Sequence, residues 1–341
     1  YFHDRKLRSN PPAPREKETP LEADPYGMQF HKFSKNRPEN IDFLKRVRAL
    51  LDEFPGTATV GEVGEAHRAI EIMAAYTAGD DLLHMCYSFD MLGPTFTPRH
   101  FRSRVEKFFK GAPDGWPCWS FSNHDVNRHI SRWEAHAVTP GSLGRLSAAL
   151  LLSLKGSVCI YQGEELGLPE AELEYSELTD PPGLRFWPDN KGRDGCRTPM
   201  PWTDEPNAGF SEVKPWLPVK APHFKRNVAA LEADPASLLH YYRAILKYRK
   251  DNPALIDGEI TFYDVTDPSS AFRDRAARMH WSASATFRPC HTRCRSRDCP
   301  IWPPWPAPRT VPRSRERRSS LRAMVSPLSN AGPVSIRPLS R

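Results

Sequence analysis

The sequence has no hydrophobic run long enough to cross a membrane. A membrane-spanning helix needs about 20 apolar residues in a row, and the longest apolar stretch here covers only residues 146–154. The first four residues also lack the basic head and apolar core of a secretory signal peptide. There is no initiator methionine either, so we expect the true N-terminus to be missing, and the absent signal excludes little. With 39% apolar residues the chain suits a soluble, cytoplasmic protein, and we expect no membrane partner.

Cysteine pairs and clusters are lacking in the body of the chain. Residues 1–274 contain four cysteines that stand alone, Cys86, Cys118, Cys159 and Cys196. Isolated thiols of this kind, three of them within strand-like runs, normally serve as small buried hydrophobes. Nothing in their spacing indicates a disulfide framework or a zinc site, so we predict no metal and no cofactor.

Lysine is absent from residues 275–341. This tail holds 14 Arg and only two acidic residues, a net charge of +12, whereas residues 1–274 hold 34 basic and 39 acidic residues. The formal net charge of +7 therefore comes from the tail. The mildly acidic body gives no reason to expect a nucleic-acid partner.

We interpret residues 272–341 as a disordered or frameshifted Arg/Pro-rich tail, because Arg, Pro, Ser and Ala are what GC-rich codons give when read out of frame. A nucleic-acid arm is one alternative, and strongly salt-dependent DNA binding would support it. A second alternative is a metal site formed by the cysteines and the histidine of residues 290–299, but their spacing matches no common zinc pattern.

After a Pro-rich loop over residues 1–40, strand-like and helix-like segments alternate. The strand patterns cover residues 57–63, 84–89, 118–121 and 157–161, and the helix patterns cover residues 41–51, 66–78, 97–110, 143–155 and 236–250. Thr97 followed by Pro98 predicts the start of one helix. Four alternations with buried-type strands imply an α/β fold, a parallel sheet covered by helices. Four units are half of a (β/α)8 TIM barrel. A doubly wound sheet is the alternative, although no Gly-rich phosphate loop follows any strand.

These patterns divide the chain into three parts. Residues 1–252 are predicted to form half of a barrel and include a long irregular insertion over residues 164–235, which is rich in Pro, Asp, Glu and Trp. Loops of that length in compact domains tend to be functional. A strand pattern at residues 259–263 predicts the start of a small β domain over residues 253–271. The tail, residues 272–341, follows.

Polar residues stand at or just after the ends of the predicted strands. They are Glu62, Asp90, Asp125 and Glu164. In a parallel barrel the carboxyl ends of the strands are the face that carries the chemistry. Two alternatives stay open: residues 123–125 could cap the next helix, since Asn and Asp are good N-cap residues, and Glu62 could form an ion pair with Arg68.

Two or three convergent carboxylates are the equipment of glycoside hydrolysis. One acid protonates the leaving oxygen, one carboxylate attacks or activates water, and another stabilises the cationic transition state. Aromatic side chains near the strand ends and in the insertion could stack on sugar rings, with core packing as the alternative that explains several of them. They are Tyr87, Phe89, Trp116, Trp119, Trp133, Tyr161, Phe186, Trp187 and Trp202.

Five short motifs follow one another along the chain. They are Thr-Val-Gly-Glu at residues 59–62, Phe-Ser-Asn-His-Asp at 121–125, Arg128 with Ser-Arg-Trp at 131–133, Tyr-Gln-Gly-Glu-Glu-Leu-Gly at 161–167, and Arg-Asp-Gly-Cys-Arg-Thr-Pro-Met-Pro-Trp at 193–202. In this order they resemble the α-glucosidase and oligo-1,6-glucosidase group of the α-amylase family of glycoside hydrolases. The resemblance covers roughly residues 1–270. It implies strands five to eight of the barrel, followed by the start of a C-terminal β domain.

The resemblance also implies roles for four residues. Glu62 would be the general acid/base and Asp125 the transition-state stabiliser, while His124 and Arg128 would bind substrate. The implied reaction is retaining hydrolysis of α-linked glucose in oligosaccharides. The resemblance implies nothing about the oligomeric state.

Two segments of that family have no counterpart in this sequence. One carries an Asp and a His after the third strand, and the other, Gly-Phe-Arg-x-Asp, carries the nucleophile. Residues 1–4 resemble the sequence just after that nucleophile, so we expect a fragment. Retention needs a nucleophile opposite the acid, and its loss removes most of an enzyme's rate. We therefore expect this chain to be inactive.

Two other classes of function remain open. One is another family member, such as a sucrose hydrolase, a trehalose synthase or a glucosyltransferase. The other is a non-catalytic relative, either a carbohydrate-binding module or a transporter-accessory subunit. Glu62 and Asp125 argue against the second class, since such a protein has no need of both.

Overall fold

The computed structural model describes residues 4–13, 28–65, 68–137 and 141–262. All of them belong to one compact unit, residues 1–288. The interpretations of the Arg/Pro-rich tail, as a frameshifted segment, a nucleic-acid arm or a metal site, lie outside the described residues.

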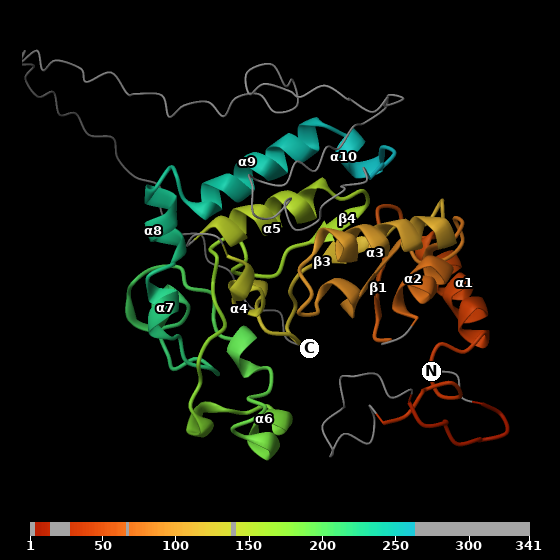
Figure 1. The fold of residues 1–341 in the computed structure, drawn as a ribbon, viewed down its shortest axis with the longest axis horizontal. Helices are drawn as coiled ribbons and strands as arrows, with labels where there is room; N and C mark the ends of the chain where they lie inside the picture. Colours follow the sequence, from red (N-terminus) through yellow and green to blue (C-terminus); the bar gives the residue numbers. More distant parts are fainter. Residues whose placement is uncertain (1–3, 14–27, 66–67, 138–140, 263–341) are drawn as a thin grey trace, which may run out of the picture. The chain divides into compact units, whose positions relative to one another are not determined.

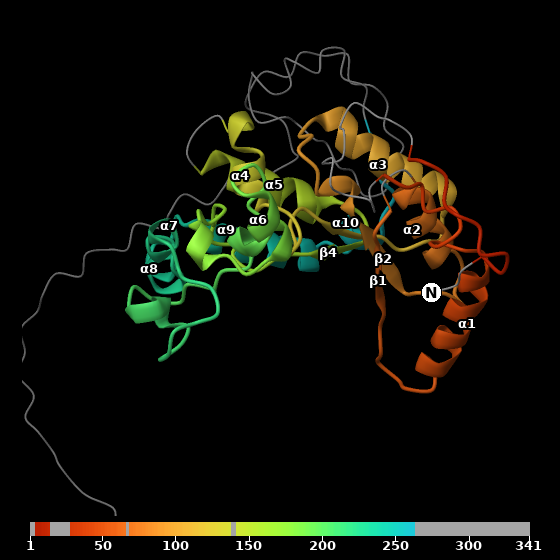
Figure 2. The same cartoon turned by 90° about the horizontal axis from the view of Figure 1, so that it is seen from below.

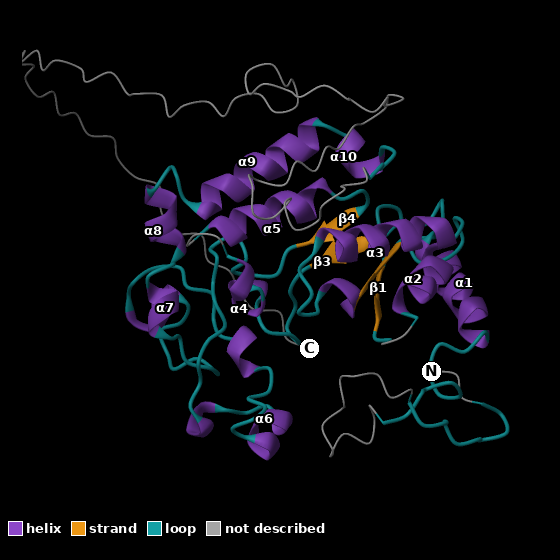
Figure 3. Ribbon diagram, viewed as in Figure 1, coloured by secondary structure: helices purple, strands orange, loops and turns teal. Residues whose placement is uncertain are grey.

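Four parallel strands follow one another in the order of the sequence (Figures 1 and 3). They are β1 (Val60–Val63), β2 (Met85–Ser88), β3 (Cys118–Ser120) and β4 (Ser157–Cys159). β1 pairs with β2 and β3 with β4, and a parallel bridge between Cys86 and Pro117 links the two pairs. Strand neighbours are therefore chain neighbours, without the reversal of order that marks a doubly wound sheet. The parallel pairing is confirmed, and each strand is shorter than its sequence pattern.

Helices separate and follow the strands. They are α1 (Glu39–Leu51), α2 (Ala69–Thr77), α3 (Pro98–Gly111), α4 (His129–Arg132), α5 (Ser142–Ser153), α6 (Pro181–Phe186), α7 (Ala221–Phe224), α8 (Val228–Ala233), α9 (Leu238–Asp251) and α10 (Ala254–Asp257). The five longest, α1, α2, α3, α5 and α9, are the five helices predicted from sequence periodicity. α3 starts as predicted, because the Thr97 hydroxyl accepts a hydrogen bond of 3.2 Å from the backbone N–H of His100.

Apolar spacing decides which face each helix buries. α3 turns Phe101, Val105 and Phe108 toward the core, at intervals of four and three residues. α5 is apolar on more than one side and therefore packs against both the main core and α9 (Figures 1 and 2). Its Leu152 packs with Tyr242 of α9 in a second cluster.

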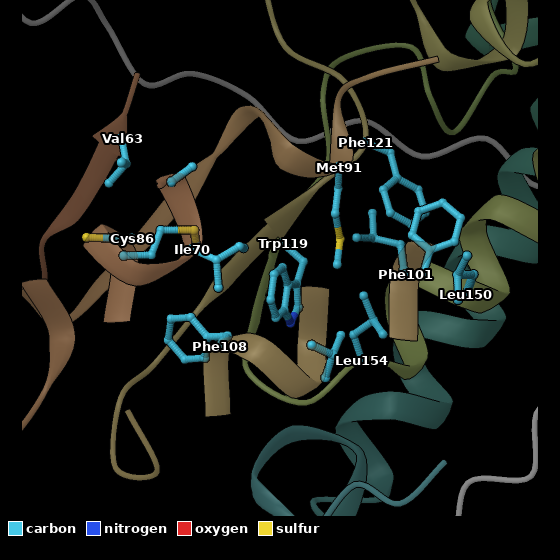
Figure 4. Packing of buried hydrophobic residues seen from close by; sticks show 14 of the residues in the cluster. Val63, Ile70, Cys86, Met91, Phe101, Phe108, Trp119, Phe121, Leu150 and Leu154 are labelled. Carbon is cyan, nitrogen blue, oxygen red and sulfur yellow. The ribbon is translucent and has the colours of Figure 1, made fainter. Parts of the chain in front are cut away.

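The main core gathers around Trp119 of β3, with Phe108 and Leu154 among its neighbours (Figure 4). Beside it, Phe121 and Trp133 pack edge to face at a centroid distance of 5.2 Å. The indole N–H groups are satisfied by backbone carbonyls, that of Trp119 by Lys155 and that of Trp133 by Gly93. Both tryptophans are fully buried, so the core-packing alternative is right for them and sugar stacking is not.

The segment after the last helix differs from its sequence pattern. Residues 259–262 form no strand, although they are rich in residues with high β propensity. Ile260 and Phe262 instead pack against the main core. Within the described ranges, no helix is both long and apolar enough to cross a membrane.

Candidate active site

Glu62 and Tyr87 face each other across β1 and β2. They are paired in the parallel register, and the Tyr87 hydroxyl donates a hydrogen bond to Glu62 Oε2. Burial raises the pKa of Tyr87 well above its usual value, and the Glu62 carboxylate adds to the rise. Tyr87 therefore stays protonated and remains a donor. The described residues show no ion pair between Glu62 and Arg68. The partner of the Glu62 side chain is Tyr87 instead.

Asp125 lies in the loop that follows β3. The Asn123 side chain accepts a hydrogen bond of 2.9 Å from the backbone N–H of Asp125, which makes an Asx turn. α4 begins only at His129, and its N-cap position is Arg128, which makes no side-chain cap. Residues 123–125 therefore shape the loop and do not cap the helix.

Two arginines hold the Asp125 carboxylate. Arg193 Nη1 and Arg197 Nη2 each donate a hydrogen bond of 2.9 Å to Asp125 Oδ1. Arg193 is fixed in turn by Asp180, whose buried carboxylate accepts at 2.7 Å from Nη2 and at 3.0 Å from Nε. The hydrogen bonds from Arg193 lower the pKa of Asp180. The loop of the fifth sequence motif is thus anchored beside Asp125.

His124 and Arg128 have opposite environments. The His124 side chain is 58% exposed, and its Nε2 lies 3.7 Å from Asp125 Oδ2. Arg128 is buried, with 3% of its surface exposed, and its guanidinium donates to the backbone carbonyls of Gln162 and Cys196. Arg128 therefore joins two loops. These contacts give no support to its predicted role in sugar binding, which stays a prediction.

The Tyr87 phenol is affected by both predicted catalytic carboxylates. The charges of both Glu62 and Asp125 raise its pKa, and the Asn123 amide lowers it. The two acids thus act on one phenol at the carboxyl ends of the strands. In the sequence Tyr87 stands out only as an aromatic residue, because its register opposite Glu62 depends on how two strands pair. The roles of Arg193 and Arg197 were also missed.

The other two polar residues at strand ends are placed differently. Asp90 forms an ion pair of 2.9 Å with Arg104 of α3, which is a structural contact. Glu164 is buried in the segment that follows β4, near His129. In the part of the chain that the structure describes, no group of three or more His, Cys, Asp or Glu side chains could hold a metal ion.

Comparison with known proteins gives close relatives. Residues 6–258 match the family described as "Alpha amylase, catalytic domain". A "Probable alpha-glucosidase" of Rhizobium meliloti (strain 1021) is 54% identical over 268 residues, which are 77% of this chain and 49% of that protein. An "Oligo-1,6-glucosidase" of Heyndrickxia coagulans is 29% identical over 274 residues, which are 70% of this chain and 48% of that protein.

Solved structures agree. The alpha-glucosyl transfer enzyme XgtA is 47% identical with a TM-score of 0.73, and the match covers 78% of this chain and 50% of that one. The trehalulose synthase MutB of Pseudomonas mesoacidophila MX-45 has a TM-score of 0.59 at 23% identity, over 68% of this chain and 47% of its own, and shows the fold alone. The chain spans about half the length of the curated relatives that it matches. With all five motifs inside residues 6–258, the chain belongs to the α-amylase family of glycoside hydrolases and to its TIM-barrel catalytic domain.

Proposed function

We propose that this chain supplies the acid/base and the transition-state stabiliser of a retaining α-glucosidase that acts on α-linked glucose in oligosaccharides. The observation that carries the proposal is that both acids lie at the carboxyl ends of parallel strands, Glu62 on β1 with a hydrogen bond from Tyr87 and Asp125 in the loop after β3. The names of the relatives from Rhizobium meliloti and Heyndrickxia coagulans support this substrate class. We further propose that β1 to β4 are strands five to eight of the barrel.

The two carboxyl groups have separate tasks in this proposal. Glu62 protonates the leaving oxygen and then activates water, for which an exposed side chain with one fixed hydrogen-bond partner is suitable. Asp125, which Arg193 and Arg197 hold in place, stabilises positive charge on the sugar. The exposed His124 ring beside Asp125 binds a sugar hydroxyl.

A chimaera tests these roles. The part of the Rhizobium meliloti relative that precedes the matched region is fused to Tyr1, and hydrolysis of maltose and of an aryl α-glucoside is measured. We expect activity with retention of the α anomer. Glu62→Gln should lower kcat/KM for maltose by roughly 100-fold or more and should lower kcat/KM for the aryl glucoside less, because this ratio reports the first step, in which a good leaving group needs little protonation.

Asp125→Asn should reduce kcat for both substrates to a similar extent, because stabilisation of the cation does not depend on the leaving group. The exposed Glu71, which pairs with Lys107 on α3, provides the control variant Glu71→Gln. Equal losses of kcat/KM for both substrates in Glu62→Gln would contradict the acid/base role of this residue.

We also propose that a polypeptide of these 341 residues alone has no glucosidase activity. No Gly-Phe-Arg-x-Asp segment occurs in it, so the carboxylate that would attack the sugar is not among its residues. Assay of the purified polypeptide with a chromogenic α-glucoside checks this expectation. Turnover that Glu62→Gln abolishes would refute it.

Glucosyl transfer is a second candidate, favoured by the 47% identity to the alpha-glucosyl transfer enzyme XgtA. Transfer and hydrolysis share the acid/base and the stabiliser and differ in the acceptor. Product analysis of the chimaera with maltose and an added alcohol separates the two. Glucosylated alcohol as the main product would favour transfer, and free glucose alone would favour hydrolysis.

A further inference from the structure

A buried polar cluster closes the loop that carries Asp125. His129 donates from its backbone N–H to Ser122 Oγ at 3.0 Å, and its Nδ1 lies 3.0 Å from the same oxygen. On the other side of the ring, Nε2 lies 2.9 Å from Ser147 Oγ of α5. Ser122 precedes the Asp125 loop and His129 follows it, so this cluster ties the two ends of the loop together.

The direction of these hydrogen bonds follows from the supply of hydrogens. Ser147 donates its only hydroxyl hydrogen to the Gly144 carbonyl at 3.1 Å, so its oxygen accepts from His129 Nε2–H. Burial lowers the pKa of His129 to about 3, with Arg132 and Arg128 adding to the fall, so the ring is neutral and has one hydrogen. Nδ1 therefore accepts the Ser122 hydroxyl hydrogen.

Glu164 reaches this cluster from the segment after β4. Its side chain is 3% exposed, and Oε1 lies 3.8 Å from His129 Nδ1. Neither carboxyl oxygen has a hydrogen-bond partner among the described residues. Since Ser122 has already given its hydrogen to Nδ1, a charged Glu164 would face lone pairs of Nδ1 and Ser122 Oγ, and an unpaired buried charge is costly.

We propose that Glu164 is a positioning residue for Asp125, which acts through Ser122 and His129 by keeping the two ends of the Asp125 loop together. As a neutral acid it has the hydrogen that the cluster lacks, and Ser122 Oγ is the acceptor within the cluster. The inference rests on the proposed function for the role of Asp125.

Burial favours the neutral acid. It raises the pKa of Glu164 to about 8, the charge of Glu165 adds to the rise, and the backbone of Tyr161 and the charge of Arg128 offset it only in part. The charged and titratable groups around Glu164 are Cys159, Glu165, Arg128, His129, Arg132 and Tyr242. Above about pH 8 the acid loses its hydrogen, and we expect the loop to open more often.

Hydrogen exchange of the 341-residue chain tests this inference. Exchange of peptides covering residues 121–130 is followed from pH 6 to 9 and corrected for the intrinsic rate. We expect protection in the wild type to fall by roughly tenfold between pH 8 and pH 9, as the acid ionises. Glu164→Gln has a neutral amide donor and should keep its protection to pH 9, whereas Glu164→Ala should lack it at every pH.

Two controls separate positioning from general stability. Peptides of α9, residues 238–251, should exchange alike in wild type and in Glu164→Gln. Glu172→Gln, at an exposed carboxylate paired with Lys191, should behave as wild type. Constant protection in the wild type from pH 6 to 9, or loss of protection in Glu164→Gln equal to that in Glu164→Ala, would overturn the inference.

The comparison of wild type with Glu164→Gln still decides if Glu164→Ala fails to fold. The exchange experiment contains no sugar and measures no activity. A failed chimaera assay would therefore count against the proposed function, and a failed exchange experiment would count against the positioning role of Glu164.

Discussion

A single tyrosine connects the chemistry of the two predicted catalytic acids. Tyr87 donates to Glu62, and the charges of Glu62 and Asp125 both make the phenol harder to ionise. Tyr87 thus orients the Glu62 carboxyl group and reports on the charge of the site.

Ultraviolet titration of the tyrosines checks this coupling. The difference between wild type and Tyr87→Phe should show one phenol that ionises well above the usual pKa of a tyrosine, chiefly because it is buried. Glu62→Gln should shift this titration to lower pH, because it removes a negative neighbour, and Asp125→Asn should do so to a smaller extent. Glu174→Gln, at an exposed residue outside the site, is the control. A Tyr87 titration unchanged by Glu62→Gln would refute the coupling.

At the scale of elements, Arg249 of α9 connects two helices. Its buried guanidinium donates to the backbone carbonyl of Leu152 in the last turn of α5 and to those of Leu154 and Gly156, which follow the helix. Backbone carbonyls in the last turn of a helix have no hydrogen-bond donor within the helix. A cation at this end of the helix also interacts favourably with the helix dipole. The Arg249 guanidinium therefore fixes the end of α5 shortly before β4 begins.

Arg249→Met should lower the free energy of unfolding by about 3 kcal/mol, because it leaves several buried carbonyls without a donor. Arg243→Met on the same helix removes an exposed pair with Glu232 and should have no measurable effect. Urea unfolding of the three proteins provides the comparison. Equal midpoints for Arg249→Met and Arg243→Met would show that the carbonyls find other partners.

At the scale of the whole molecule, buried titratable groups set the response to pH. Burial raises the pKa of Glu164 to about 8 and that of Glu170 to about 7, above their unfolded values. Burial lowers the pKa of His129 to about 3 and that of His223 to about 4. Compared with the unfolded chain, the folded state therefore binds protons more tightly at the two glutamic acids and more weakly at the two histidines.

The sign of each effect follows from proton linkage. The stabilisation by the two glutamic acids is lost as the pH rises from about 4.5 to 8, because only the unfolded chain releases their protons there. The stabilisation by the two neutral histidines is lost as the pH falls below about 6.5. We expect the melting temperature to be highest near pH 5 to 6 and to fall on both sides.

The double variant Glu164→Gln and Glu170→Gln should flatten the alkaline side of the curve, and His223→Gln should flatten part of the acid side. Melting curves recorded from pH 4 to 9 provide the measurement. An alkaline slope that the double variant leaves unchanged would assign the loss of stability to other groups.

Local sequence predicted much of the fold. Periodic apolar residues placed α3 and α9, and Thr97 with Pro98 marked the start of α3. The strand pattern at residues 259–263 was misleading over residues 259–262, where Ile260 and Phe262 pack against the core. Whether an apolar side chain pairs in a sheet or packs in a core depends on distant residues.

The sequence by itself determined the family, the order of the elements and the positions of Glu62 and Asp125, because these are encoded in short contiguous motifs. Only the tertiary structure decided what surrounds them. Arg193 and Arg197 reach Asp125 across 68 and 72 residues of chain. Arg128, predicted to bind sugar, is buried between two loops. Such contacts depend on how separate loops pack together, and no local pattern of residues specifies that packing.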